Sequence, residues 1–377
     1  MPRGSMPPPE LPFSLDRSPH TRRWAGFSLS CSCRWLFLLV LVVFSIAPAM
    51  LAQEPSSPAQ VLLRKGQAAL ESGDFQGAVQ SFEQARQLAP DNIQAARGLL
   101  LSYLQDGRVA QALALGRNLV ERWPQDAQLH HWLGLAFFKN GQNTEAAAQL
   151  REAQHFDATS FDVHFDLALV LLTDQQYSPA ADELEKALKI TPSNPLAHVL
   201  LGRAYQNTNR TVEAVQQFQS ALQINPNIPL GHYHLGFAYA SLGKNHEAIV
   251  EYEKELARSP PNPDVLFQLG HTQLETGDWK SAILNLRRAT EVNTQNADEA
   301  FYDLGKGLLL QGDVAQAIAA LRQAVTLNPS DPSPHYQLAR AFEKMGDKEQ
   351  AGEEWQRFAE ARKSQRQSGG MATGRVH

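Results

Sequence analysis

The stretch PLGHYHLGFAYASLGKNHEAIVEYEKELARSPPN, residues 229–262, decides the fold of this chain. Apolar residues recur at helical spacing in both of its halves, namely Leu235, Ala238, Tyr239 and Leu242, then Ala248, Ile249, Tyr252 and Leu256. Gly243 separates the halves, at the point where a helix ends in a left-handed residue. Pro260 is expected to stop the second helix and Asn262 to cap the next one. The stretch therefore predicts two helices joined by a turn.

The same pattern recurs with a period of 34 residues in nine repeats from Ala59 to about Glu360, with one extra residue around 293–297. Position 20 is always Ala, at Ala78, Ala112, Ala146, Ala180, Ala214, Ala248, Ala282, Ala317 and Ala351. Position 8 is small except at Leu100, at Gly66, Gly134, Ala168, Gly202, Gly236, Gly270, Gly305 and Ala339. Small residues at these two positions let the paired helices cross closely, and a Leu at either would cost about 1–3 kcal/mol. Position 15 is Gly or Asn except at Gln175.

This pattern resembles the tetratricopeptide repeat, which is apolar at position 7, small at 8 and 20, and aromatic at 11 and 24, with Pro at 32. The resemblance covers residues 59–361. It implies an all-α fold, a right-handed superhelical solenoid of helix–turn–helix repeats, and the chain resembles the exported repeat proteins of bacteria. Strand-favouring runs are absent, so we expect almost no sheet.

The segments outside the array give expectations about location. Residues 1–34 read as a disordered basic segment, 53–58 as a linker and 362–377 as a disordered tail. Residues 35–52 contain no charge, follow Arg34 and end in small residues. This is typical of a signal peptide cleaved after Ala49 or Ala52, and the alternative is one uncleaved inner-membrane anchor. Both readings place the repeats outside the cytoplasm, in the periplasm or secreted, and limit membrane contact to residues 35–52.

Composition and motifs argue against several function classes. The formal charge is −5, and five arginines against two acids in residues 1–52 leave −8 on the rest, which disfavours nucleic acid as a partner. The only cysteines, Cys31 and Cys33, precede the array, so no thiolate metal site is expected. No catalytic motif is present, and we predict no enzyme activity and no cofactor. Histidines recur at position 4, where packing is the expected role rather than metal binding: His130, His164, His198, His232 and His335.

The resemblance also implies a groove, because positions 2, 5, 9 and 12 of the first helices face the concave side in this family. The predicted groove residues are His131, Phe165, Arg203, Tyr233, Phe237, Phe267, His271, Tyr302, Lys306, Tyr336 and Arg340. Aromatic rings beside cations suit an extended peptide. Alternatively, the rings pack between neighbouring first helices, and the cations are solvated or paired with Asp264, Glu299 or Glu343.

These features predict a non-catalytic scaffold that binds a peptide or helix of a protein partner in the concave groove. Some family members clamp a terminal carboxylate with Lys and Asn at positions 5 and 9, where this chain has aromatic residues, so such a clamp is disfavoured. Two alternatives remain: a membrane-anchored component of envelope assembly or secretion, and a substrate-recruiting subunit of a separate enzyme.

Overall fold

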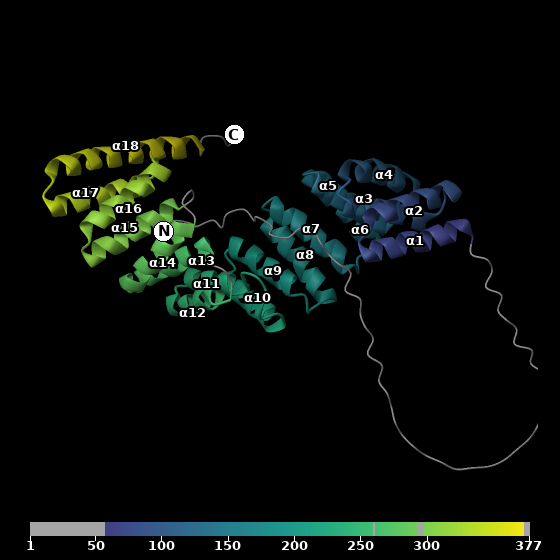
Figure 1. Cartoon of the computed structure of the whole chain (residues 1–377), viewed down its shortest axis with the longest axis horizontal. Helices are drawn as coiled ribbons and strands as arrows, with labels where there is room; N and C mark the ends of the chain where they lie inside the picture. Colours follow the sequence, from purple (N-terminus) through teal and green to yellow (C-terminus); the bar gives the residue numbers. More distant parts are fainter. Residues whose placement is uncertain (1–56, 259–260, 293–296, 373–377) are drawn as a thin grey trace, which may run out of the picture. The chain divides into compact units, whose positions relative to one another are not determined.

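The structure is a computed structural model that describes residues 57–258, 261–292 and 297–372. Within these residues it contains eighteen α-helices and no strand (Figure 1). The first helices of successive repeats are α1 Pro58–Ser72, α3 Ile93–Gln105, α5 Ala127–Lys139, α7 Phe161–Thr173, α9 Pro195–Asn207, α11 Gly231–Ser241, α13 Pro263–Glu275, α15 Asp298–Gln311 and α17 Pro332–Met345. The second helices are α2 Phe75–Leu88, α4 Val109–Arg122, α6 Asn143–Phe156, α8 Tyr177–Ile190, α10 Thr211–Ile224, α12 Asn245–Leu256, α14 Trp279–Val292, α16 Val314–Leu327 and α18 Lys348–Ala372. The nine predicted helix pairs are confirmed.

The chain forms two compact modules, one up to Gln175 and the other from Gln176 onward. The first module contains α1–α7 and the second contains α8–α18, so the boundary falls inside the fourth repeat. Most of the predicted groove residues belong to the second module.

Each helix pair turns through a left-handed residue at position 15. Seven repeats place Gly there with φ between 72° and 92°. The other two repeats place Asn209 at φ 61° and Gln175 at φ 57°. Glycine takes this conformation without steric cost, and Asn tolerates it, but Gln does so less readily. The repeat frame therefore sets the turn even where the residue is unfavourable.

Close crossing of the two helices explains the small residues at position 8. A Cβ added at Gly305 would lie 2.5 Å from Leu321 Cγ, and one at Gly236 would lie 2.8 Å from Tyr252 Cε1. In both repeats the opposing side chain is at position 24 of the second helix. The Ala residues at position 20 of repeats 3 and 5–8 are fully buried at the same crossings. The predicted crossing is confirmed.

First helices form the inner layer of each module. Besides its own second helix, α11 contacts α9 and α13, and α15 contacts α13 and α17. In the second module, the corresponding second helices make no comparable contacts with one another within the described residues. Within each module the first helices therefore form one continuous layer, with the second helices packed on its other side (Figure 1).

Position-4 histidines join the helices, as predicted. His130 Nδ1 lies 2.8 Å from Gln149 Oε1, and its Nε2 lies 2.9 Å from the carbonyl oxygen of Pro124. His198 repeats this arrangement with Gln217 and Pro192, at 2.7 and 3.0 Å. The imidazole therefore links the two helices of its own repeat to the end of the preceding helix. Within the described ranges, no group of three or more His, Cys, Asp or Glu side chains forms a metal site.

Three details differ from the expectations or extend them. Asn262 caps α13, as predicted, by accepting from the N–H groups of Asp264 and Val265. Leu230 is left-handed, with φ 58°, and α11 starts only after it, at Gly231. Within the expected disordered tail 362–377, residues 362–372 are helical, since α18 continues to Ala372, and residues 373–377 lie outside the described ranges. Residues 362–367 are good helix formers without proline, which allows this extension.

Several expectations fall on residues outside the described ranges: segments 1–34, 35–52 and most of 53–58, the helix stop at Pro260, and the insertion around 293–297. Among the helices that the structure describes, none combines the length and the apolar character needed to cross a membrane.

Candidate functional site

The predicted groove residues divide between the two modules. His131 and Phe165 belong to the first module, and the other nine belong to the second. Phe165 is 1% exposed and stacks on Phe161 with 5.4 Å between ring centroids, so its ring is buried rather than lining a surface. His131 Nε2 lies 2.8 Å from Asp166 Oδ2, which holds its imidazole against the next first helix.

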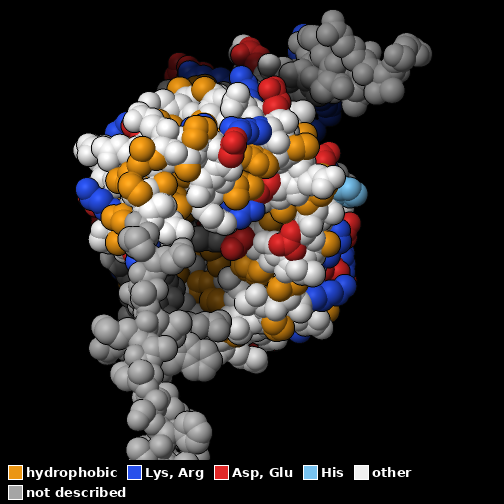
Figure 2. All heavy atoms as spheres, turned by 90° about the vertical axis from the view of Figure 1, so that its right-hand side faces the viewer, with side chains coloured by type: hydrophobic (Ala, Val, Ile, Leu, Met, Phe, Trp, Pro, Cys, Tyr) orange, Lys and Arg blue, Asp and Glu red, His pale blue; other side chains and the backbone are white. Residues whose placement is uncertain are grey.

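The first module has its own hollow beside His131. A groove of about 900 Å³ is lined by Arg97, Trp123, Gln128, His131 and Trp132, among others. Arg97 is held there by two hydrogen bonds to Asp126 Oδ2, at 3.1 and 2.5 Å. On the α1–α4 end of the chain (Figure 2), side chains of both charges are interspersed with hydrophobic ones. This face therefore lacks the continuous basic stripe that nucleic-acid binding requires.

In the second module, the five predicted aromatic residues lie half-buried along the first helices. Tyr233 and Phe237 pack against the core around Tyr252, and Phe267 and Tyr302 pack against the cores of later repeats. Tyr336 lies edge-on to Trp355, with centroids 5.4 Å apart. Each ring thus uses part of its surface for packing between helices, as one alternative expects, and leaves part exposed.

Two of the three predicted cations have partners within the groove. Lys306 Nζ lies 3.1 Å from Asp303 Oδ1 and 5.3 Å from the centroid of the Tyr302 ring. Arg340 Nη1 donates to the Tyr336 hydroxyl at 3.4 Å and lies over that ring. Lys306 therefore pairs with Asp303 rather than Glu299, and Arg340 contacts the Tyr336 hydroxyl rather than pairing with Glu343.

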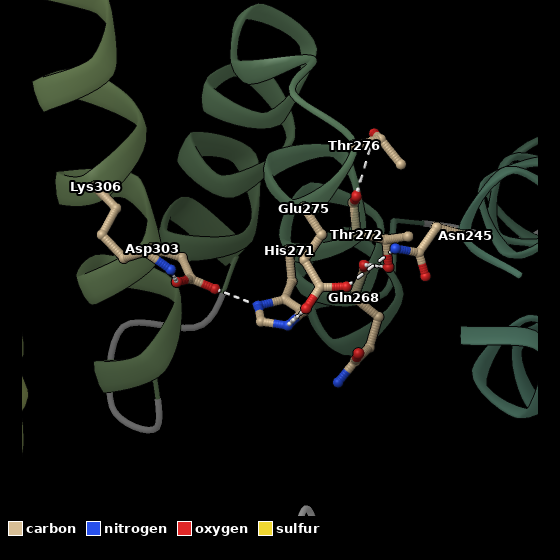
Figure 3. Close-up of polar contacts among 8 residues, drawn as sticks. All are labelled: Asn245, Gln268, His271, Thr272, Glu275, Thr276, Asp303 and Lys306. Atoms are coloured by element: carbon tan, nitrogen blue, oxygen red, sulfur yellow. Dashed lines mark hydrogen bonds and ion pairs between the residues drawn. The ribbon is translucent and has the colours of Figure 1, made fainter. Parts of the chain in front are cut away.

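His271 is held between two carboxylates (Figure 3). Its Nδ1 lies 2.6 Å from Asp303 Oδ2, and its Nε2 lies 3.6 Å from Glu275 Oε1. The hydrogen bond to Asp303 raises the pKa of His271 despite the opposing effect of burial, and the charges of Asp303 and Glu275 add to the increase. Burial by itself raises the pKa of Asp303, but the hydrogen bond from His271 and the charge of Lys306 outweigh burial and lower it. An ionised network therefore joins α13 to α15.

This network predicts a pH dependence of stability. The folded-state pKa of His271 is raised above its usual 6.5, so its contribution is fully present below that value and is lost as the pH rises through the folded-state pKa. We expect the urea midpoint of the wild type to fall relative to that of His271→Gln as the pH rises through this window. The exposed His246 provides the control, because His246→Gln should follow the wild-type profile. Parallel profiles for wild type and His271→Gln would contradict the prediction.

Arg203 differs from the other two groove cations. Within the described residues it forms no ion pair, and the expected pairing with Asp264 is absent. Its Nε is buried without a hydrogen-bond partner, and burial lowers the pKa of its guanidinium. The neighbouring His234 also has a buried Nδ1 without a partner, and burial together with the charge of Arg203 lowers its pKa to about 3. His234 is therefore neutral at physiological pH.

Sequence reasoning missed the contribution of position 6. Asp303, Asp166 and His234 all occupy this position, and each meets a groove residue from another repeat. The family pattern does not assign position 6 to the groove. The usable signal was a polar or ionisable residue directly after the aromatic residue at position 5, as in Tyr233-His234 and Phe165-Asp166.

Comparisons with known proteins agree with this architecture. Family models described as tetratricopeptide repeat match residues 63–127, 102–163, 231–262 and 335–362, and one described as TPR repeat matches 208–243 and 306–346. A comparison with curated proteins found no significant match.

Solved structures show the same fold at low identity. The chain is similar to a protein in the Cut9–Hcn1 hetero-tetramer of the APC/C, with 18% identity and a TM-score of 0.50 over 76% of this chain. It spans only 56% of that protein. It is also similar to PilF of Pseudomonas aeruginosa, with 22% identity and a TM-score of 0.50, covering 57% of this chain and 97% of PilF. These similarities establish the helical-repeat fold and nothing about partners.

Proposed function

Because this chain belongs to the tetratricopeptide repeat family, we propose that its second module binds an extended peptide or a helix of a partner protein along the first helices. The observation that carries this proposal is the row of half-buried aromatic rings at Tyr233, Phe267, Tyr302 and Tyr336. Repeat proteins of this family generally serve as interaction scaffolds. A preformed concave surface loses little conformational entropy when it binds a peptide.

The role is recognition without chemistry. Apart from Arg203, the charged groove residues are occupied in contacts among themselves, as in the His271–Asp303–Lys306 network. Such contacts orient side chains for binding and leave no nucleophile beside a base. In this proposal, any reaction on the bound partner belongs to a separate protein.

Crosslinking from defined positions tests the site. A photo-crosslinking residue at Tyr302, on the inner helix α15, should capture the partner, whereas one at Leu284, which is 61% exposed on the second helix α14, should not. Equal capture from both positions would remove the groove from the proposal. Capture from Leu284 alone would move the binding surface to the second helices.

Binding by the captured partner should depend on the aromatic anchor. We expect Tyr302→Ala to weaken it by about 2 kcal/mol, roughly 30-fold in Kd, because a half-buried Tyr is a typical hot-spot residue. Titration calorimetry measures this change, with Leu284→Ala as the matched control on the other helix layer. A Tyr302→Ala protein that keeps its melting temperature and its affinity would contradict the role of this ring.

We further propose that the array acts outside the cytoplasm, on the basis of residues 35–52. The N-terminal sequence of the mature protein tests this. Cleavage after Ala49 or Ala52 favours a free exported protein, whereas an intact Trp35 favours the membrane-anchored alternative of envelope assembly or secretion. A protein found only in the cytoplasm would contradict both.

A further inference from the structure

The second module contains a group of buried polar atoms that the protein itself leaves unsatisfied. The Arg203 cluster consists of Arg203 and Gln206 on α9 and Tyr233 and His234 on α11. Arg203 Nε, both polar atoms of the Gln206 side chain and His234 Nδ1 are buried without a hydrogen-bond partner. Four such atoms on adjacent first helices are unusual, since almost all buried polar groups in proteins are paired.

The charge makes this cluster costly in the free protein. A half-buried cation without a counter-charge is partly desolvated without compensation, which is unfavourable. Arg97 is paired with Asp126 and Lys306 with Asp303, whereas Arg86 Nε, like Arg203 Nε, is buried without a hydrogen-bond partner. No acid pairs with Arg203 within the described residues. A ligand that brings a negative charge to Arg203 supplies the partner that this guanidinium lacks.

The side chains that act electrostatically on Arg203 itself are the neutral Tyr177 and Tyr233, although the carboxylate of Asp264 acts on Tyr233, and this sets the charge of a matching ligand. His234 is neutral, with its pKa lowered to about 3, and its ring stacks on Phe218 with centroids 5.5 Å apart. Burial raises the pKa of Tyr233 to about 12, so its hydroxyl also stays neutral and can donate. The single positive charge of the Arg203 guanidinium therefore matches a ligand group with a single negative charge, such as a carboxylate. A phosphate group carries more charge at neutral pH.

The geometry favours a planar acceptor. The guanidinium of arginine presents its N–H groups as a flat fork that matches the two oxygens of a carboxylate. Gln206 lies one turn further along α9, and the half-buried Phe237 lies one turn further along α11, 6.4 Å from the Tyr233 ring. A peptide lying across these helices can thus place an acidic side chain on Arg203 and an apolar neighbour on Phe237.

We propose that the Arg203 cluster is an anion subsite that binds the carboxylate of an aspartate or glutamate side chain within the partner peptide. The subsite rests on the proposed groove function and specifies its ligand class. Gln206 and the Tyr233 hydroxyl donate to the same carboxylate, so the unsatisfied donors around Arg203 acquire partners only in the complex.

Degenerate peptide libraries test the preference. The full chain is titrated with two fluorescent octapeptide libraries, acetylated and amidated, that carry either Glu or Gln at one central position. We expect the wild type to bind the Glu library about ten-fold tighter, Arg203→Met to lose the difference, and Lys280→Met, an exposed cation on the second helix α14, to keep it. The subsite would be overturned if Arg203→Met kept the wild-type preference for the Glu library, or if the wild type showed no such preference. A third library carries Gln at the central position and a free C-terminus. If only this library binds tightly, the ligand is a terminal carboxylate, and the assignment to an acidic side chain is overturned.

Stability of the unliganded protein gives an independent readout. Because Arg203 is unpaired in the free state, Arg203→Met should raise the melting temperature, whereas Lys306→Met, which breaks a pair with buried Asp303, should lower it. A lower melting temperature for Arg203→Met would show that the guanidinium already has a structural partner and would overturn the proposal.

The two proposals fail in different ways. If both libraries crosslink to the first helices with equal affinity, the groove function stands and the anion subsite fails. If no peptide crosslinks to the first helices, the groove function fails. The subsite is then tested separately by an NMR titration with acetate, in which the Arg203 Nε–H resonance is identified by its loss in Arg203→Met. A shift of that resonance supports an anion site, and no shift overturns it.

Discussion

Replacing Phe218 by Ala is expected to lower the free energy of unfolding by about 3–5 kcal/mol. Phe218 is fully buried on α10 and contacts two first helices. Its ring faces Gly202 of α9, where an added Cβ would lie 2.6 Å from Cε1, and it stacks on His234 of α11. The substitution therefore empties the crossing within repeat 5 and its interface with repeat 6 together.

The consequence should extend beyond one cavity because repeat arrays depend on coupling between neighbours. Urea unfolding followed by circular dichroism measures the loss, and a broadened or two-step transition would report uncoupling. The matched control is Val212→Ala on the same helix, since Val212 is 58% exposed and should change stability by no more than about 0.5 kcal/mol. Equal effects of the two substitutions would contradict the structural role assigned to Phe218.

The fold was predictable because every interaction that defines a repeat is encoded within one period. Gly236 needs only the facing Tyr252 at position 24, and Gly243 needs only a left-handed turn at position 15. Both partners lie within 34 residues, so one well-formed repeat specifies the pattern and eight more copies confirm it. Leu230 escaped prediction because its left-handed conformation has no sequence signal. Its N–H donates to Glu255 Oε1, 25 residues away.

The candidate site was predictable only in outline. The frame identified which side chains share the inner helix layer, but the contacts that decide their roles run between repeats. Asp303 neutralises Lys306 on its own helix and His271 on another, whereas Arg203 receives no such partner. Burial divides the set further, since Phe165 is enclosed and Tyr302 is half exposed. The position of a residue in the repeat predicts which helix layer it lies in, whereas its contacts with the neighbouring repeat determine whether it is paired, buried or free to bind.

The second large effect is expected at the C-terminal repeat. His335 and Glu354 are both buried, with 2.6 Å between Nδ1 and Oε2, and Arg357 Nη1 lies 2.6 Å from the other carboxylate oxygen. Glu354→Ala should cost about 3 kcal/mol, because it leaves a buried imidazole and a guanidinium without their common partner. Chemical unfolding at a single pH, followed by circular dichroism, measures the loss.

The chain contains its own control for this substitution. In repeats 3 and 5, the same histidine position meets a glutamine, at 2.8 Å in His130–Gln149 and 2.7 Å in His198–Gln217. Glu354→Gln therefore reproduces an arrangement that the fold already accepts, and it should cost only about 1 kcal/mol, mainly through the lost charge beside the half-exposed Arg357. If Glu354→Gln is as damaging as Glu354→Ala, the charge and not the hydrogen bond holds this repeat together. The terminal repeat would then differ from repeats 3 and 5 and resemble repeat 6, where His232 meets Glu251.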